Sequence, residues 1–382
     1  MQLARLSGWT AIAACLAVSV TACRGDAGEG GGDRFSADGG ATIGDGDGDG
    51  DGDMSGDGDG DGDMSGDGDG DGDGDDGAKF DVGSGDGDGD GDGSTQCIAH
   101  TPCDAGTSDP FAAMGLGCAG ELAINGTVDA HPAGIAILDG WGADGTYDPR
   151  EGSSFLAIST GDLAERNDVP ADMGDMAYHC NSWFTPGDGM DTTQFPAPIV
   201  TNPVAGDCLQ NSGLVGTGDC SGSIGPQFGQ SGFKYDYQEV RFKVTVPQGA
   251  KALSFDLAYL TKEWPIFVSQ PYNDMFVAWL ESSTWSGNVS FDSQGNALSL
   301  NAAFFQLTDT NGTLPAFAGT CMRYSGGTPW LTTTVDVPEG EEIELVLAIF
   351  DLDDVNWDSF VFLDNFRWEC DEYTGPQTTP AG

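Results

Sequence analysis

The chain of 382 residues carries 62 acidic and 13 basic side chains, giving a formal net charge of −49 at neutral pH. This balance excludes an electrostatic nucleic-acid binder, because phosphate recognition needs a basic face, and it disfavours docking on anionic lipid headgroups. Ten cysteines against three histidines favour disulfides formed in an oxidising compartment over a zinc site.

The first residues predict an export signal and a lipid anchor. Residues 11–20 form an apolar run that is too short to span a bilayer, as in a signal peptide over residues 1–22. The segment Val20-Thr21-Ala22-Cys23 resembles the lipobox of bacterial lipoproteins. The resemblance implies cleavage before Cys23 and acylation of its thiol and amine, a stable anchor because several acyl chains share one residue. By the same resemblance, Arg24 in place of Asp implies the outer membrane rather than retention in the inner membrane.

Residues 23–96 predict a disordered acidic linker behind this anchor. Asp and Gly alternate over 45–75, and the unit MSGDGDGDGD occurs at 54–63 and again at 64–73. Such a segment has little to bury, so it cannot offset its ordering entropy, and its like charges extend it into a spacer. The D-x-D-x-D-G pattern from Asp45 matches the start of an EF-hand loop. The twelfth position lacks the required Glu, which favours weak, diffuse cation binding.

Residues 97–373 predict one folded domain, followed by a disordered tail over 374–382. The first half of the domain is rich in Gly, Pro and Asp and contains short apolar runs such as 154–159. From residue 240 onward, apolar and polar residues alternate in segments separated by turn signals such as Pro247-Gln248-Gly249. Roughly eight such strands predict an all-β fold, a jelly-roll-like β-sandwich with long disulfide-tied loops.

Eight cysteines in this domain predict four disulfides, formed among Cys97, Cys103, Cys118, Cys180, Cys208, Cys220, Cys321 and Cys370. Sequence spacing favours two local pairs and one pair that ties the last strands: Cys97 with Cys103, Cys208 with Cys220, and Cys321 with Cys370. The remaining connectivity is open, because eight cysteines allow about 105 pairings.

The stretch 349–368 carries the strongest signal for a site. An apolar strand runs into an acidic loop, and a second strand, apolar on both faces, contains Asp364. A carboxylate inside a buried strand is costly unless it is paired or bound to a cation. Acids gathered at a strand end suit Ca²⁺, which is the only cofactor expected here, in a structural role. The candidate ligands are Glu263, Asn273, Asp274, Asp351, Asp353, Asp358 and Asp364. The alternative is a solvated loop in which Asp364 accepts backbone N–H groups and Asn273 and Asp274 cap turns.

Several motifs in order resemble the bacterial choice-of-anchor L domain over residues 110–370. They are Met114-Gly115-Leu116, 156–161, Lys262-Glu263-Trp264-Pro265, Tyr272-Asn273-Asp274-Met275-Phe276, 289–292, 326–333, Asp358-Ser359 and Leu363-Asp364-Asn365-Phe366. Lys262 and the acid-rich 352–354 loop depart from the pattern. The resemblance implies surface display on varied anchors and a β-rich fold, and it implies no known activity.

These observations predict a non-catalytic cell-surface lipoprotein that binds or adheres, with a polysaccharide or another surface protein as partner. Trp285, Trp330 and Trp357 lie in predicted loops, where they either stack on sugar rings or pack against the loops. Two alternatives stay open. One is an extracellular hydrolase of the glycosidase type that uses carboxylates near 351–364, and the other is a structural component of the envelope.

Overall fold

The computed structural model describes residues 100–164, 180–181, 194–228, 233–270 and 272–382. The predicted signal peptide, Cys23, the acidic linker and Cys97 lie outside these residues. Within the described ranges, no helix is long and apolar enough to cross a membrane.

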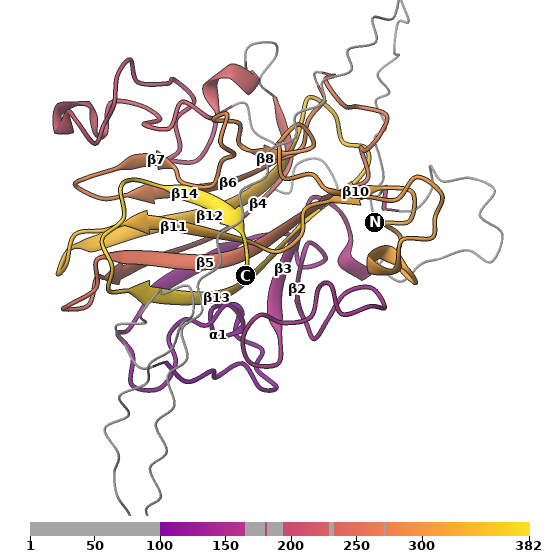
Figure 1. The fold of residues 1–382 in the computed structure, drawn as a ribbon, viewed down its shortest axis with the longest axis horizontal. Helices are drawn as coiled ribbons and strands as arrows, with labels where there is room; N and C mark the ends of the chain where they lie inside the picture. Colours follow the sequence, from indigo (N-terminus) through magenta and orange to yellow (C-terminus); the bar gives the residue numbers. More distant parts are fainter. Residues whose placement is uncertain (1–99, 165–179, 182–193, 229–232, 271) are drawn as a thin grey trace, which may run out of the picture. The chain divides into compact units, whose positions relative to one another are not determined.

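Two antiparallel sheets pack face to face, which confirms the predicted all-β sandwich (Figure 1). The first sheet runs β1 (Asn125–Asp129), β4 (Lys234–Thr245), β12 (Glu342–Leu352), β6 (Met275–Glu281) and β7 (Ser286–Asn288), with β8 (Leu298–Ser299) also paired to β6. The second sheet runs β14 (Gln377–Pro380), β11 (Leu331–Asp336), β5 (Ala252–Thr261), β13 (Ser359–Glu369), β3 (Phe155–Ser159) and β2 (Ile135–Leu138). The short strands β10 (Gly326–Gly327) and β9 (Leu307–Thr308) extend it beside β5.

The long strands alternate between the sheets, which makes the fold jelly-roll-like. The chain passes from β4 in the first sheet to β5 in the second and back to β6, and β11, β12 and β13 alternate likewise (Figure 1). The register pairs Phe350 with Met275 and Ser359 with Thr261. The ends of β5 and β12 and the starts of β6 and β13 therefore meet at one end of the sandwich.

The main core lies between the sheets and follows the alternation of each strand. On β5, Leu253, Phe255, Leu257 and Tyr259 point inward, and all are at most 2% exposed. The opposite face of the second sheet carries its own apolar layer, in which Phe360 and Phe362 pack under loop residues. Strand β13 is therefore buried on both faces, as its continuous apolar sequence predicts.

Helical segments are short and confined to connections. Helix α1 spans Pro110–Ala113, and the Asp109 side chain caps it by accepting the Phe111 N–H at 3.0 Å. Among the described residues, 3₁₀ turns lie at Ser212–Leu214, Gly225–Phe228 and Pro315–Phe317.

The disulfides agree with the sequence prediction at one of the three suggested pairs. The observed bonds are Cys103–Cys118, Cys180–Cys321 and Cys208–Cys220, and Cys370 is also disulfide-bonded. The local pair Cys208–Cys220 is confirmed. The Cys97–Cys103 and Cys321–Cys370 pairs are wrong, because folding brings Cys118 and Cys180 to the partners that sequence proximity assigned elsewhere.

The predicted disordered tail at 374–382 is also wrong. Strand β14 pairs with the edge strand β11, with Leu331 opposite Pro380, and the Thr378 and Thr333 hydroxyls lie 3.0 Å apart. The segment has almost no apolar signal, yet an open sheet edge accepts any strand with free backbone groups, and Pro is tolerated on an edge.

Replacing Phe362 tests the outer apolar layer of the second sheet. Its buried ring lies 4.9 Å from that of Phe155, 5.2 Å from Trp141 and 5.5 Å from Tyr147. We expect Phe362→Ala to lower the free energy of unfolding by about 3–5 kcal/mol in urea denaturation, because it leaves a cavity among these rings. Leu122→Ala, at a side chain 46% exposed, is the control and should change it by less than about 0.5 kcal/mol. If both variants lose the same free energy of unfolding, Phe362 does not contribute to stability through the outer apolar layer.

Candidate metal centre

Three buried carboxyl groups meet where strands of both sheets end. Glu263 follows β5, Asp274 precedes β6, and Asp351 is the penultimate residue of β12. Glu263 and Asp274 are 0% exposed and Asp351 is 2% exposed. The strand alternation that points Tyr259 and Phe276 into the main core also directs the cluster toward the space between the sheets.

Hydrogen bonds hold this carboxylate cluster, Glu263, Asp274, Asp351 and the half-buried Asp354, to both sheets. Glu263 Oε2 accepts the Asp274 N–H at 3.0 Å, and the Ser359 hydroxyl donates to Asp274 Oδ2 at 2.6 Å. The Asp274 and Asp351 carboxyl groups are neighbours, and each influences the pKa of the other.

Each member of the cluster has a buried oxygen that accepts no hydrogen bond. These atoms are Glu263 Oε1, Asp274 Oδ1, Asp351 Oδ1 and Asp354 Oδ1. Two other buried aspartates, Asp219 and Asp309, have both carboxylate oxygens bonded. Asp219 accepts from Ser221, Ile224 and Asn288, and Asp309 accepts the backbone N–H groups of Thr313, Leu314 and Tyr324. A buried polar atom without a partner is costly, so four carboxylate oxygens from neighbouring residues favour a cation as their common partner.

Burial dominates the electrostatics of the cluster. Burial, with a smaller contribution from the Asp354 carboxylate, raises the pKa of Glu263 to about 8. Burial and then the neighbouring carboxylate raise the pKa values of Asp274 and Asp351 well above the ordinary range. Within the described residues, no lysine, arginine or histidine is ion-paired with Glu263, Asp274 or Asp351.

The donor set fits a hard divalent cation. Ca²⁺ takes roughly six to eight oxygen ligands, most of them carboxylate, carbonyl or amide oxygens. The cluster supplies carboxylates from both sheets, and the buried Asn273 beside it adds an amide oxygen. Asp236, at the start of β4, lies close enough to raise the pKa of Asp351. A cation here would neutralise charge that the surrounding protein leaves uncompensated.

A tighter group of potential ligand atoms lies elsewhere and does not suit a metal. His100, Cys118 and Glu121 form the one such group in the described ranges whose ligand atoms all lie within 4.8 Å of one another. Cys118 is bonded to Cys103 and offers no thiolate, and the His100 ring nitrogens face Glu121 on one side and Glu151 on the other. The ligand atoms of the carboxylate cluster lie farther apart than those of this group. A bound ion would therefore draw together the loop that follows β5 and the loop that follows β12.

Asp364 does not belong to the cluster, which corrects the sequence prediction. Its carboxylate accepts the N–H groups of Arg150 at 2.6 Å, Glu151 at 3.2 Å and Asn365 at 2.7 Å. Burial raises its pKa to about 7, although these three bonds favour the charged form. Asp364 lies five positions after Ser359 along β13, which is roughly 16 Å at the rise of a strand.

Two further predicted ligands face other partners. Asp358 is buried against Gly161, and its charge partly offsets the burial that lowers the pKa of Lys262 to about 8. The Lys262 Nζ donates to the Cys321 and Arg323 carbonyls. Asp353 acts on Lys234 in the same way. The site instead recruits Asp354, Ser359 and Thr160, which donates to Asp351. Asp354 lies in the acidic loop that the sequence analysis identified as a candidate site. Nothing in the sequence indicated that the hydroxyl groups of Ser359 and Thr160 would lie beside the carboxylates.

Two of the three candidate tryptophans for sugar stacking are buried, which corrects that prediction. Trp285 is 5% exposed in the main core, and Trp330 is 6% exposed and packs edge-on against Phe155 at 5.6 Å. Trp357 is half-buried, and its ring lies 5.0 Å from that of Phe267.

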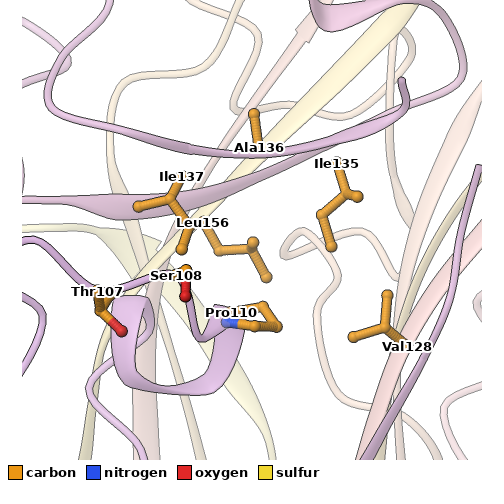
Figure 2. A pocket seen from close by; sticks show the side chains of 8 residues that line it. All are labelled: Thr107, Ser108, Pro110, Val128, Ile135, Ala136, Ile137 and Leu156. Carbon is orange, nitrogen blue, oxygen red and sulfur yellow. The ribbon is translucent and has the colours of Figure 1, made fainter. Parts of the chain in front are cut away.

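A separate apolar pocket of about 520 Å³ lies between the edges of the two sheets. Figure 2 shows Val128 of β1, Ile135 and Ile137 of β2 and Leu156 of β3 around it, with Ala136 pointing the other way. Thr107 and Ser108 supply hydroxyls, and no charged side chain lines the pocket. It can hold an apolar group, but these residues cannot perform acid–base chemistry.

Comparison of the chain with protein-family models, with curated proteins and with solved structures finds no significant match.

The raised pKa values predict how stability depends on pH in a chelator. The folded state of Glu263, Asp274 and Asp351 holds protons more tightly than the unfolded chain, whose carboxyls titrate near pH 4. The free energy of unfolding should therefore fall as pH rises from about 4 to about 8. Urea denaturation across this range measures it. Glu263→Gln should make the free energy of unfolding depend less on pH, whereas general charge repulsion would be unchanged by this substitution. If the variant and the parent protein have the same slope, the carboxylate cluster is not the cause of the pH dependence.

Proposed function

We propose that this protein is a non-catalytic cell-surface lipoprotein whose β-sandwich is stapled by Ca²⁺ and serves in binding or adhesion. The observation that carries the proposal is the set of four buried, unpaired carboxylate oxygens contributed by Glu263, Asp274, Asp351 and Asp354. The lipobox ending in Cys23 and the resemblance to choice-of-anchor L domains support outer-membrane display facing the outside of the cell.

The ion would act as a staple because its ligands come from different parts of the sandwich. Glu263 belongs to the connection that leaves the second sheet, whereas Asp274 and Asp351 belong to strand ends of the first sheet. Without a cation, charging these carboxyls sets like charges against each other in a dry space. With it, the same charges hold the two sheets and two loops together, so a structural role is the simplest use of the site.

Burial favours this role over hydrolysis. A glycosidase needs two carboxyl groups roughly 5–9 Å apart on a surface that the sugar can reach. Glu263, Asp274 and Asp351 are at most 2% exposed, so a substrate could not contact them without opening the end of the sandwich. A purely structural role in the cell envelope is the second candidate function. Finding a specific ligand would favour the binding role over the structural one.

Thermal unfolding with and without Ca²⁺ tests the staple. A ligand that binds only the folded state at a hundredfold excess over its Kd stabilises it by about 2.7 kcal/mol. We expect Ca²⁺ to raise the Tm by several degrees relative to chelator, and Asp351→Asn to abolish the rise. Asp364→Asn is the matched control, since that carboxylate is saturated by backbone N–H groups, and its Tm should still rise. Diffuse binding to the Asp-Gly linker would not stabilise folding, so an unchanged Tm in the parent protein refutes the site.

The anchor is tested by metabolic labelling with a fatty acid. We expect Cys23→Ser to lose the label and to leave the membrane fraction, because the acylated thiol is gone. Cys15→Ser, within the apolar run of the signal, is the control and should keep both. Retention of label in the Cys23 variant would refute lipidation at this residue.

A further inference from the structure

Exposed apolar side chains are concentrated in the loop between Glu263 and Asp274. Seven large hydrophobic residues are exposed in the described part of the chain, and three of them lie in this loop: Ile266 at 58%, Val268 at 41% and Tyr272 at 37%. Single exposed apolar residues need no explanation, but three within seven positions mark an interaction surface.

Aromatic rings extend this surface onto the neighbouring loop. The Phe267 ring lies 5.6 Å from that of Tyr272 and 5.0 Å from that of Trp357, and both pairs meet edge to face. Trp357 has φ of 72°, a left-handed conformation that costs a bulky residue of order 1–3 kcal/mol and persists only where the surroundings enforce it. The rings of Tyr272, Phe267 and Trp357, with Ile266 and Val268, are called the aromatic face below.

The carboxylate cluster forms the base of both loops. The Glu263 carbonyl accepts the N–H groups of Ile266 at 2.9 Å and Phe267 at 3.0 Å, while its carboxylate accepts the Asp274 N–H. Asp354 lies three residues before Trp357 and acts electrostatically on Glu263. A cation that draws these carboxylates together therefore fixes the relative position of Phe267 and Trp357.

Charge narrows the class of partner. The chain has a formal net charge of −49, so nucleic acid, an anionic bilayer and a second copy of the chain would all be repelled. The aromatic face itself is uncharged, and the exposed side chains of Ser269, Gln270 and Asn356 at its margin offer hydroxyl and amide groups. Rings that stack, flanked by amides that donate and accept hydrogen bonds, match the alternating apolar faces and hydroxyl groups of a sugar chain.

We propose that the aromatic face binds a neutral polysaccharide and that the bound cation orders it for this purpose. The proposal deepens the proposed function and rests on it for the role of the ion. Tyr272 and Trp357 supply the stacking surfaces, Phe267 sets their separation, and Gln270 and Asn356 contact sugar hydroxyls. Of the tryptophans that the sequence offered for sugar stacking, only Trp357 takes part.

Native affinity electrophoresis of the soluble Cys23→Ser protein tests the proposal. The probes are four neutral polysaccharides cast in the gel: a β-glucan, an α-glucan, a mannan and a galactan. We expect at least one to retard the protein in Ca²⁺, and Tyr272→Ala or Trp357→Ala to weaken its affinity roughly tenfold or more. Leu122→Ala, an exposed apolar side chain beside the turn after β4 at the other end of the sandwich, is the matched control and should migrate like the parent.

Three results would overturn the proposal: no retardation by any of the four probes, retardation unaffected by either aromatic variant, or flotation with phosphatidylcholine vesicles in place of glycan binding. The Tm shift with Ca²⁺, measured on the same proteins, separates the two proposals. Tyr272→Ala should keep the shift while losing retardation, whereas Asp351→Asn should lose both. If the gel still retards the protein in the presence of a chelator, glycan binding by the aromatic face is supported, and the claim that the ion orders this face is refuted.

Discussion

The constraint on which the rest of this structure depends is the desolvation of several carboxyl groups at one end of a β-sandwich. Glu263, Asp274 and Asp351 project into the space between the sheets, where water does not reach them. Burial raises the pKa of each of these carboxyl groups, so it disfavours their charged forms. Charging them requires a positive partner, and none of the described basic side chains is paired with them. A divalent cation would answer this requirement, because it would convert mutual repulsion into a cross-link between the sheets.

The topology makes this arrangement possible and connects it to the surface. Strands that alternate between the sheets bring the end of β5, the start of β6 and the end of β12 to one place. The two connections that begin and end there are those that carry Phe267, Tyr272 and Trp357. The same carboxylates are thus the last residues of the core and the first residues of the exposed loops. In this arrangement, a cation that stabilised the fold would also order the exposed aromatic face.

The contrast among aspartates in one protein shows that residue type alone does not define a site. Asp219 and Asp309 have their carboxylates saturated by nearby donors, and they act as loop anchors. Asp364 accepts three backbone N–H groups. Asp351, at the end of β12, is equally buried, but no backbone N–H donates to its Oδ1. What separates a structural aspartate from a candidate ligand is therefore the direction of neighbouring N–H groups, which depends on loop conformation.

By itself the sequence determined the all-β class, because alternation along β4, β5 and β12 and the doubly apolar β13 are local patterns that depend only on which face each side chain takes. It also predicted the Cys208–Cys220 bond, because the two cysteines are close in the sequence. Glu263, Asp274 and Asp351 could be chosen as candidate ligands because acids at the ends of predicted strands are visible in the sequence. Only the tertiary structure separated Asp364 from that group, added Asp354, Ser359 and Thr160, and paired Cys180 with Cys321. It also buried Trp285 and Trp330 and placed Gln377–Pro380 on a sheet edge. These outcomes depend on contacts between residues far apart in the chain, whose register and loop geometry no local pattern specifies.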